Sequence, residues 1–188
     1  TSSFKNSFFK DSDIKDYDIS LASVRAGNVI GGGDWADNRI IPDIMRGILN
    51  KEIIKIRNPT AVRPWQHVLE PLRGYLELAE KLWNSESEYA ESWNFGPDDE
   101  DIKPVSWIVK EIIEMWGGNI QVDNDNLNFK HETNFLKLDC SKAKSKLKWK
   151  VKFPGKLLYQ GLPKLITGLP LQMASQPTVP PTVATHLA

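Results

Sequence analysis

The sequence predicts an α/β fold over about its first 150 residues. Segments with strand-like and helix-like patterns alternate along this part of the chain, as they do in α/β proteins. The apolar, β-rich run 19–30 is typical of a buried strand in a parallel sheet. The composition, 40% hydrophobic and 26% charged in 188 residues, is that of an ordinary globular protein. The first element reads as the end of a helix and few strands follow, so the pattern indicates part of a larger unit.

The first predicted elements are a helix, a strand and a second helix. Aromatic residues at a helical spacing predict the last turns of an amphipathic helix within residues 1–10. The strand in 19–30 enters the loop Gly-Gly-Gly-Asp-Trp-Ala-Asp-Asn at 31–38. A short helix is expected over 40–50, where Pro42 is acceptable in the first turn.

Two longer helices follow. The helix 67–83 has an apolar face, which we expect to be buried. The residues near that face are Val68, Leu72, Tyr75, Leu76, Ala79 and Leu82. The helix 104–118 starts near Pro104 and ends at two glycines, 117 and 118, which are typical of a helix terminus.

Short strands and a small helix complete the predicted fold. The strands are expected at 53–57, 92–96, 119–122 and 134–138. A Lys-rich helix is expected over 139–149, with Asp139 or Ser141 as its N-cap. After Lys152 prolines and glycines recur without a helix or strand period, and we expect disorder over 171–188.

Composition excludes several classes of protein. No apolar run approaches the roughly 20 residues that a transmembrane helix needs. The single cysteine, Cys140, rules out an internal disulfide framework and most zinc sites. A reducing, cytoplasmic setting is therefore expected. The N-terminal segment has no apolar signal core, so secretion is not indicated.

The neutral net charge hides a segregation of charge along the chain. Residues up to Asp139 carry 16 basic and 24 acidic side chains, whereas residues 140–188 carry eight lysines and no acid. Such asymmetry often marks a tail or an interaction segment. The Lys-rich helix 142–152 has no Arg and few aromatic residues, however, so a solvated face is a better interpretation than nucleic-acid binding.

The triple glycine 31–33 follows a predicted strand, which is the position of a phosphate-binding loop. Neither the dinucleotide motif Gly-x-Gly-x-x-Gly nor the Walker motif fits its spacing, so a flexible turn is the favoured interpretation of these glycines taken alone. Asn28 and Asn38 flank the loop, and their amides can both donate to and accept from sugar hydroxyls and phosphates. Trp35 is a candidate to cover a ring-shaped ligand.

Five arginines within 40 residues are suited to bidentate binding of phosphate. They are Arg25, Arg39, Arg46, Arg57 and Arg63. Arg63 is the most distinctive, because it stands between a predicted strand and a predicted helix and is followed by Pro64-Trp65. For any one of these arginines, a surface ion pair is the better interpretation.

Other reactive side chains give weaker indications. His67 opens a predicted helix, where a structural hydrogen bond is the simpler interpretation. Neighbouring lysines would lower the pKa of Cys140, but a structural residue at a helix start is the alternative. The sequence has no His-x-x-x-His or Cys/His cluster, so no metal site is predicted.

Four stretches of the sequence resemble one family closely. They are SVRAGNVIGGGDWADNRIIPDIMRGI (23–48), IKIRNPTAVRPWQHVLEPLRGYLELAEKL (54–82), ESWNFGP (91–97) and HETNFLKLDCSKAKSKLKWK (131–150). They resemble the CDP-glucose 4,6-dehydratases, a family of extended short-chain dehydrogenases/reductases that act on nucleotide sugars. The motifs Gly-Gly-Gly-Asp-Trp and Arg-Pro-Trp-Gln-His-Val set this family apart from the related TDP-glucose and GDP-mannose enzymes.

The resemblance implies a partial Rossmann-type sheet, ending at about residue 30, and a mainly nucleotide-sugar-binding region over 31–152, followed by an atypical tail over 153–188. It implies a lyase that oxidises the glucose C4 hydroxyl with bound NAD, eliminates water across C5–C6 and returns the hydride to C6. The product is CDP-4-keto-6-deoxyglucose. Homodimers are typical of the full-length family, and neither a nucleic acid nor a membrane is an expected partner.

The resemblance also implies roles for individual residues. Asn28 would meet the sugar diphosphate, and the backbone of Val29 and Ile30 would lie near the nicotinamide. Arg63 would bind the diphosphate. The remaining implied substrate contacts are Asn38 and Arg39 near the phosphates or ribose, Lys55, Ile56 and Arg57 beside the cytosine, and His131 and Glu132 where relatives place an arginine.

The sequence departs from the family in three places. The glycine-rich dinucleotide loop, the catalytic Tyr-x-x-x-Lys pair and the Thr-Asp-Glu group of the dehydratases have no counterpart in these 188 residues. We therefore expect the chain to be roughly the second half of such an enzyme and to be inactive alone. From about Phe153 the resemblance ends abruptly, for which we hypothesise a shifted reading frame or a fused tail.

Two alternatives stay open at this point. The chain would be a non-catalytic module that binds a nucleotide sugar or a partner, or a fragment of a related nucleotide-sugar epimerase. We also expect truncation to expose apolar surface and an open sheet edge, with Phe4, Phe8, Phe9 and the run 19–30 most affected.

Overall fold

The computed structural model describes residues 2–9, 19–84, 87–117, 119–124 and 133–153. The predicted disorder over 171–188 and the predicted site residues His131 and Glu132 lie outside these ranges. The chain forms two compact units, each made of three segments. Unit 1 comprises Thr1–Val29, Pro64–Ile102 and Lys137–Pro154, and unit 2 comprises Ile30–Arg63, Lys103–Leu136 and Gly155–Ala188.

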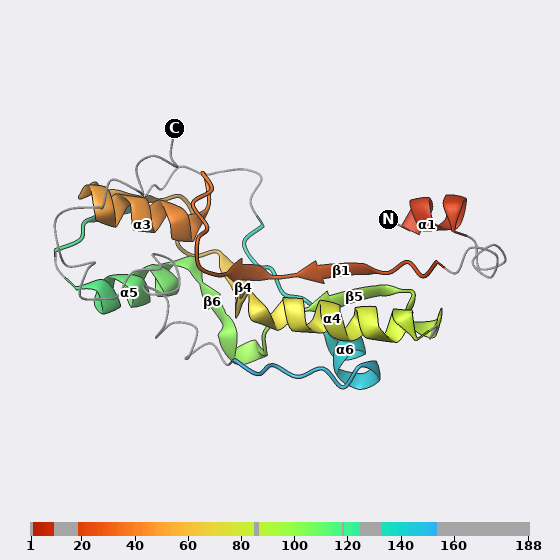
Figure 1. Ribbon diagram of the computed structural model, residues 1–188. Coiled ribbons are helices and arrows are strands. Elements are labelled where there is room, and N and C mark those ends of the chain that lie inside the picture. The colour runs from red at the N-terminus through yellow and green to blue at the C-terminus, as the bar shows by residue number, and fades with distance from the viewer. Residues whose placement is uncertain (1, 10–18, 85–86, 118, 125–132, 154–188) are drawn as a thin grey trace. The chain divides into compact units, whose positions relative to one another are not determined.

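Unit 1 is built on two parallel strands with helices beside them (Figure 1). Its elements are α1 (Ser2–Phe8), β1 (Ser23–Ala26), α4 (Leu69–Trp83), η1 (Ser87–Tyr89), β5 (Ser92–Phe95), η2 (Asp99–Asp101) and α6 (Ser141–Lys146). The register of β1 and β5 runs from Ser23 opposite Ser92 to Ala26 opposite Phe95. The two serine hydroxyl oxygens lie 2.8 Å apart, so a side-chain hydrogen bond reinforces this register.

The core of unit 1 lies between α4, β5 and α6. Its buried residues are Leu78, Trp93, Phe95, Cys140, Ala143 and Trp149. The rings of Phe95 and Trp149 meet edge to face with centroids 5.4 Å apart, a favourable aromatic geometry. A side chain at Gly74 would overlap the Phe95 ring, so this glycine lets α4 approach β5 closely.

The buried face of α4 differs from the predicted one. Tyr75 and Leu82 pack against the core as expected, but Leu72 and Leu76 are 44% and 72% exposed. The residues that α4 buries are Glu70, Pro71, Gly74 and Leu78. The prediction failed because it ranked helix faces by apolar side chains. The real face is set by the contact of Gly74 with Phe95 and by hydrogen bonds of the Glu70 carboxylate to the backbone of Lys152 and Phe153.

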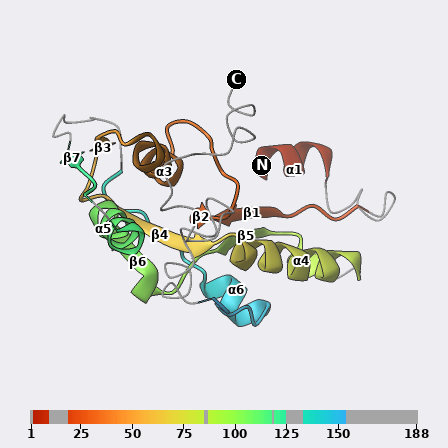
Figure 2. The same cartoon turned by 60° about the vertical axis from the view of Figure 1, so that its left-hand side comes forward.

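Unit 2 contains a second parallel pair of strands, shown with its helices in Figure 2. Its elements are α3 (Ile40–Asn50), β3 (Ile54–Ile56), α5 (Val105–Trp116) and β7 (Val122–Asn124). The bounds of α3 are those predicted, and its buried side chains include Ile44 and Met45. The hydrogen bond from Ile54 N–H to the Gln121 carbonyl, at 3.0 Å, fixes the start of the β3–β7 pairing.

A third sheet has the strand order β2–β4–β6, with β2 at Asn28–Ile30, β4 at Val62–His67 and β6 at Ile102–Pro104. The division between the two units falls within these three strands. Sequence patterns missed β4 and β6, because each contains a proline, which is unusual inside a strand. In unit 1, a side-chain carbon at Gly27 would lie 2.6 Å from the Pro64 carbonyl oxygen, so glycine is required at this position.

Most other predicted elements are present with adjusted ends. The helix expected within 1–10 is α1, although Phe4 and Phe8 are exposed, and the helix expected at 104–118 is α5. The strand expected at 119–122 forms at Val122–Asn124. The expected strand 134–138 is wrong, since its pairing is a single bridge between Val62 and Phe135. The run 19–30 forms two short strands and is only partly buried.

Candidate functional site

Five predicted substrate residues of unit 2, Asn38, Arg39, Lys55, Ile56 and Arg57, belong to the loop 31–39 and to the strand β3 with the residue after it. Asp34 Oδ1 accepts the backbone N–H of Ala36 at 3.1 Å, which closes a tight turn in the loop. Asn38 ends the loop with a φ of 61°, a left-handed conformation that Asn tolerates better than most residues. Arg39 then provides the extended N-cap of α3.

Asn38 and Arg57 come together although 19 residues separate them. Arg57 Nη2 donates to Asn38 Oδ1 over 3.4 Å, and both groups are exposed. The guanidinium of Arg57 therefore keeps other N–H donors for a ligand, and the Asn38 amide keeps its own N–H donors. An anionic or hydroxyl-bearing group is the ligand chemistry that such a donor-rich pair would bind.

Side chains along β3 alternate between the core and the solvent. Ile56 is 1% exposed and faces the core of unit 2, so only its backbone is accessible to a ligand. Lys55 lies between Ile54 and Ile56, and its side chain is exposed. Arg39 forms an exposed ion pair with Asp34 at 3.1 Å, which is the surface interpretation considered for the arginines.

Arg63 is buried, with 9% of its surface exposed. Its Nη1 donates to the carbonyl of Val62 at 2.9 Å, and the side chain makes further interactions. A surface ion pair is therefore the wrong interpretation for this residue. A buried charge without partners is strongly destabilising, so the contacts of the Arg63 guanidinium matter to the fold.

The predicted residues of β2 differ in accessibility. Asn28 and Val29 belong to unit 1 and Ile30 to unit 2. Val29 is 38% exposed, whereas Ile30 is 3% exposed. The side chain of Ile30 belongs to a core, and only its backbone is suited to contact a ring.

The loop after β2 differs in geometry from a dinucleotide-binding loop. The glycines after β2 are separated from the start of α3 by the loop that ends at Arg39, and α3 has no side-chain cap. A side-chain carbon at Gly33 would meet nothing within 4 Å, so this glycine does not mediate the close strand–helix packing of a dinucleotide loop.

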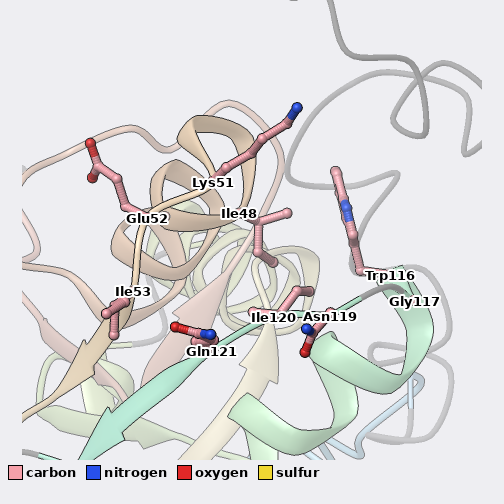
Figure 3. A pocket seen from close by; sticks show the side chains of 10 residues that line it. Ile48, Lys51, Glu52, Ile53, Trp116, Gly117, Asn119, Ile120 and Gln121 are labelled. Atoms are coloured by element: carbon pink, nitrogen blue, oxygen red, sulfur yellow. The ribbon is translucent and has the colours of Figure 1, made fainter.

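A pocket of about 450 Å³ opens elsewhere in unit 2 (Figure 3). It lies where α3 and α5 end, and Lys51 and Glu52 extend from one rim while Trp116 stands on the other side. The rest of the lining is Gly47, Ile48, Ile53, Gly117, Asn119, Ile120 and Gln121. None of the predicted site residues within the described ranges lines this pocket.

The two reactive side chains considered from the sequence are structural. His67 Nδ1 accepts the N–H of Leu69 at 3.1 Å, and burial lowers the pKa of His67 despite the nearby Glu70. Burial raises the pKa of the Cys140 thiol, which keeps it protonated. Among the described residues, no cluster of three His, Cys, Asp or Glu side chains could hold a metal ion. No described helix is long and apolar enough to cross a membrane.

Sequence reasoning missed the residues that shape the loop. Asp34 is one of these residues. An Asp side chain often accepts a hydrogen bond from the backbone N–H two residues later, so Asp34 is a local sequence signal for this turn. Arg46 is one of the five arginines suited by sequence to phosphate binding, but its contacts are to loop residues up to 11 positions away in the chain.

No protein-family model matches this chain. The chain is similar to CDP-glucose 4,6-dehydratase of Salmonella typhimurium, with 51% identity over 148 residues. That match includes 79% of this chain and 41% of the relative, so the chain spans about two-fifths of the relative's length.

Solved structures of nucleotide-sugar enzymes share the fold at low sequence identity. UDP-glucuronic acid 4-epimerase from Bacillus cereus, in complex with UDP-glucuronic acid and NAD, has a TM-score of 0.65 at 18% identity, over 80% of this chain and 45% of its own. UDP-glucose 4-epimerase from Thermotoga maritima, with UDP-glucose, has a TM-score of 0.63 at 18% identity, over 85% and 50%.

A dehydratase is among these structures. dTDP-glucose 4,6-dehydratase from Bacillus anthracis, in complex with NAD, has a TM-score of 0.58 at 17% identity, over 80% of this chain and 46% of its own. These likenesses show that the chain has a Rossmann-type α/β fold. The 51% identity over 148 residues shows a close similarity between this chain and a CDP-glucose 4,6-dehydratase, and the solved structures show a shared fold.

Proposed function

We propose that the chain supplies nucleotide-sugar-binding residues to an NAD-dependent dehydratase that converts CDP-glucose to CDP-4-keto-6-deoxyglucose. The observation that carries this proposal is the 51% identity to CDP-glucose 4,6-dehydratase over 148 residues. The donor-rich pair of Asn38 and Arg57 and the buried Arg63 support it, because a diphosphate and a cytosine need hydrogen-bond donors held in fixed positions.

Each residue has a proposed role. Arg63 binds the diphosphate, Asn28 the sugar diphosphate, and Asn38 and Arg39 the phosphates or the ribose. Lys55, Arg57 and the backbone of Ile56 flank the cytosine. The backbone of Val29 and Ile30 lies near the nicotinamide, and His131 and Glu132 complete the substrate contacts.

We propose that these 188 residues do not catalyse the reaction alone. NAD supplies the hydride chemistry in such enzymes, and the tyrosine base, its lysine partner and the glycine loop have no counterpart in this sequence. The proposed activity is therefore that of a longer or assembled enzyme. An assay in which the purified chain consumes CDP-glucose with NAD would contradict this part of the proposal.

Calorimetry with CDP, UDP, dTDP and NAD, each titrated separately, tests the binding proposal. We expect the chain to bind CDP more tightly than UDP or dTDP and to bind NAD weakly or not at all. Arg63→Ala should abolish CDP binding, and Arg63→Lys should retain part of it, since Lys keeps the charge but not the planar fork. Lys110→Gln on the exposed face of α5 is the control variant.

Failure of the wild-type chain to bind CDP under conditions where it remains folded would overturn the binding proposal. Thermal unfolding of each variant separates loss of binding from loss of fold. The epimerases among the solved structures are under 25% identical to this chain, so they share its fold and give no separate support to an epimerase function.

A further inference from the structure

One guanidinium group organises the loop that carries Asn38. Arg46 projects from α3, and its side chain is 24% exposed. Its Nη1 donates to the carbonyl of Trp35 at 2.6 Å, and its Nη2 donates to the carbonyl of Ala36 at 3.3 Å. The same Nη2 lies 3.3 Å from Asp37 Oδ1 and also contacts the Asp43 carboxylate.

The contacts of Arg46 run through three consecutive loop residues, Trp35, Ala36 and Asp37. A planar guanidinium presents its donors in a fixed fork, so contacts to successive loop residues restrict the path of the backbone there. The next residue after these three is Asn38, whose φ of 61° costs energy in a free chain. The fork therefore orders the loop immediately before its left-handed residue.

We propose that Arg46 is a positioning residue that pre-forms the nucleotide-sugar loop, so that Asn38 already faces Arg57 before a ligand arrives. A loop that is ordered in advance avoids the entropic cost of ordering during binding. If the loop were competent for only a fraction of the time, the apparent affinity would fall by the same fraction. The effect on affinity rests on the proposed function, whereas the ordering of the loop does not.

Asp43 pairs with the Arg46 guanidinium from the same helix, α3. It lies three residues before Arg46 on α3, so the two side chains share one face of the helix. This contact aims the guanidinium, and its negative charge lies in the first turn of α3, where it is favourable. Arg46 thus projects from a helix with a buried face, and the guanidinium at the end of its side chain contacts the loop.

NMR relaxation of the ligand-free chain tests the ordering. Backbone order parameters for residues 35–38 should be close to about 0.85 in the wild type and fall below about 0.6 in Arg46→Gln, with α3 unchanged. Arg46→Lys should give intermediate values, because it keeps the charge near Asp37 and Asp43 but loses the fork. Lys110→Gln, at an exposed ion pair on α5, is the matched control and should change neither segment.

CDP titration of the same variants tests the consequence. Arg46→Gln should weaken CDP binding about tenfold or more while the thermal midpoint stays close to that of the wild type. Equal order parameters in the wild type and Arg46→Gln would overturn the positioning role, whether or not CDP binds. A disordered loop with unchanged CDP affinity would overturn its link to binding. Absence of CDP binding to the wild type would overturn the proposed function and leave the ordering to be judged by relaxation alone.

Discussion

Arg57 donates a hydrogen bond from Nη2 to Oδ1 of Asn38 over 3.4 Å, which joins the strand β3 to the loop before α3. The left-handed φ of Asn38, 61°, turns the chain at this point and presents the amide to the guanidinium. The left-handed conformation of Asn38 and the long side chain of Arg57 thus together form the proposed ligand-binding pair.

Substitutions at Asn38 separate its backbone role from its side-chain role. Asn38→Gly keeps the left-handed conformation without cost and removes the amide, so CDP binding should weaken about tenfold with little loss of stability. Asn38→Ala should also lose about 1 kcal/mol of stability, because alanine has neither the local hydrogen bonding of an Asn side chain nor the conformational freedom of glycine in the left-handed region. Calorimetry and urea unfolding measure the two effects. Equal stability of the two variants would contradict a backbone role.

Glu70 is predicted to be a main stabilising residue of unit 1. Its carboxylate is 1% exposed and accepts the N–H groups of Lys152 and Phe153 at 2.7 and 2.6 Å, and it pairs with Arg73 at 3.4 Å. Glu70→Gln should lower the free energy of unfolding by about 2–4 kcal/mol, because these donors lose their charged acceptor.

Urea unfolding of Glu70→Gln and of Glu80→Gln measures this contribution. Glu80 lies on the exposed side of α4, so its variant should stay within about 0.5 kcal/mol of the wild type. If both variants unfolded at the wild-type midpoint, the buried carboxylate would not have the role assigned to it.

The exposed side of α4 carries an apolar stripe. Leu69, Leu72, Leu76 and Trp83 recur at spacings of three, four and seven residues, with exposures of 50%, 44%, 72% and 88%. Apolar stripes of this spacing are suited to contact another helix. We expect the isolated chain to self-associate and to bind a hydrophobic dye, and Leu76→Glu should reduce both without a loss of stability.

Light scattering and dye fluorescence check the apolar stripe, with Leu78→Glu as the contrasting variant. Leu78 is 2% exposed, so this change should unfold unit 1 instead of improving its solubility. A monodisperse monomer that binds no dye in the wild type would argue against exposure of the stripe in solution.

His67 should make stability depend on pH. Burial lowers its pKa from 6.5 in the folded chain, so the unfolded chain takes up a proton first as the pH falls. The contribution of neutral His67 is therefore present above about pH 6.5 and is lost as the pH falls towards the lowered folded value. His67→Asn keeps an acceptor for the Leu69 N–H but does not titrate there.

Urea unfolding of the wild type and His67→Asn between pH 8 and about pH 5 tests this effect. The stability of the wild type should decline more steeply than that of the variant below about pH 6.5. Parallel pH profiles for the two proteins would exclude His67 as the titrating group.

The sequence by itself determined the elements whose signals are local. The sequence predicted a helix over 40–50, with Pro42 in its first turn, and a helix that ends at the glycines after α5, and the bounds of α3 agree with the prediction. The glycine–tryptophan and Arg-Pro-Trp-Gln-His-Val motifs led to the family that the 51% identity then supported. Residue spacing and sequence motifs can be read from the sequence alone, so predicting these helices and this resemblance required no tertiary structure.

Only the tertiary structure decided which of several similar residues has a given environment. Arg39 is exposed beside Asp34, Arg63 is buried, and Arg46 holds a loop, although the sequence presents all three as arginines near apolar residues. The buried face of α4 was likewise decided by Phe95 and by the backbone near Lys152, which lie 21 and 82 positions from Gly74 and Glu70. Burial and hydrogen bonding depend on partners distant in the chain, and a periodic pattern reports only the character of a face, not the partner that covers it.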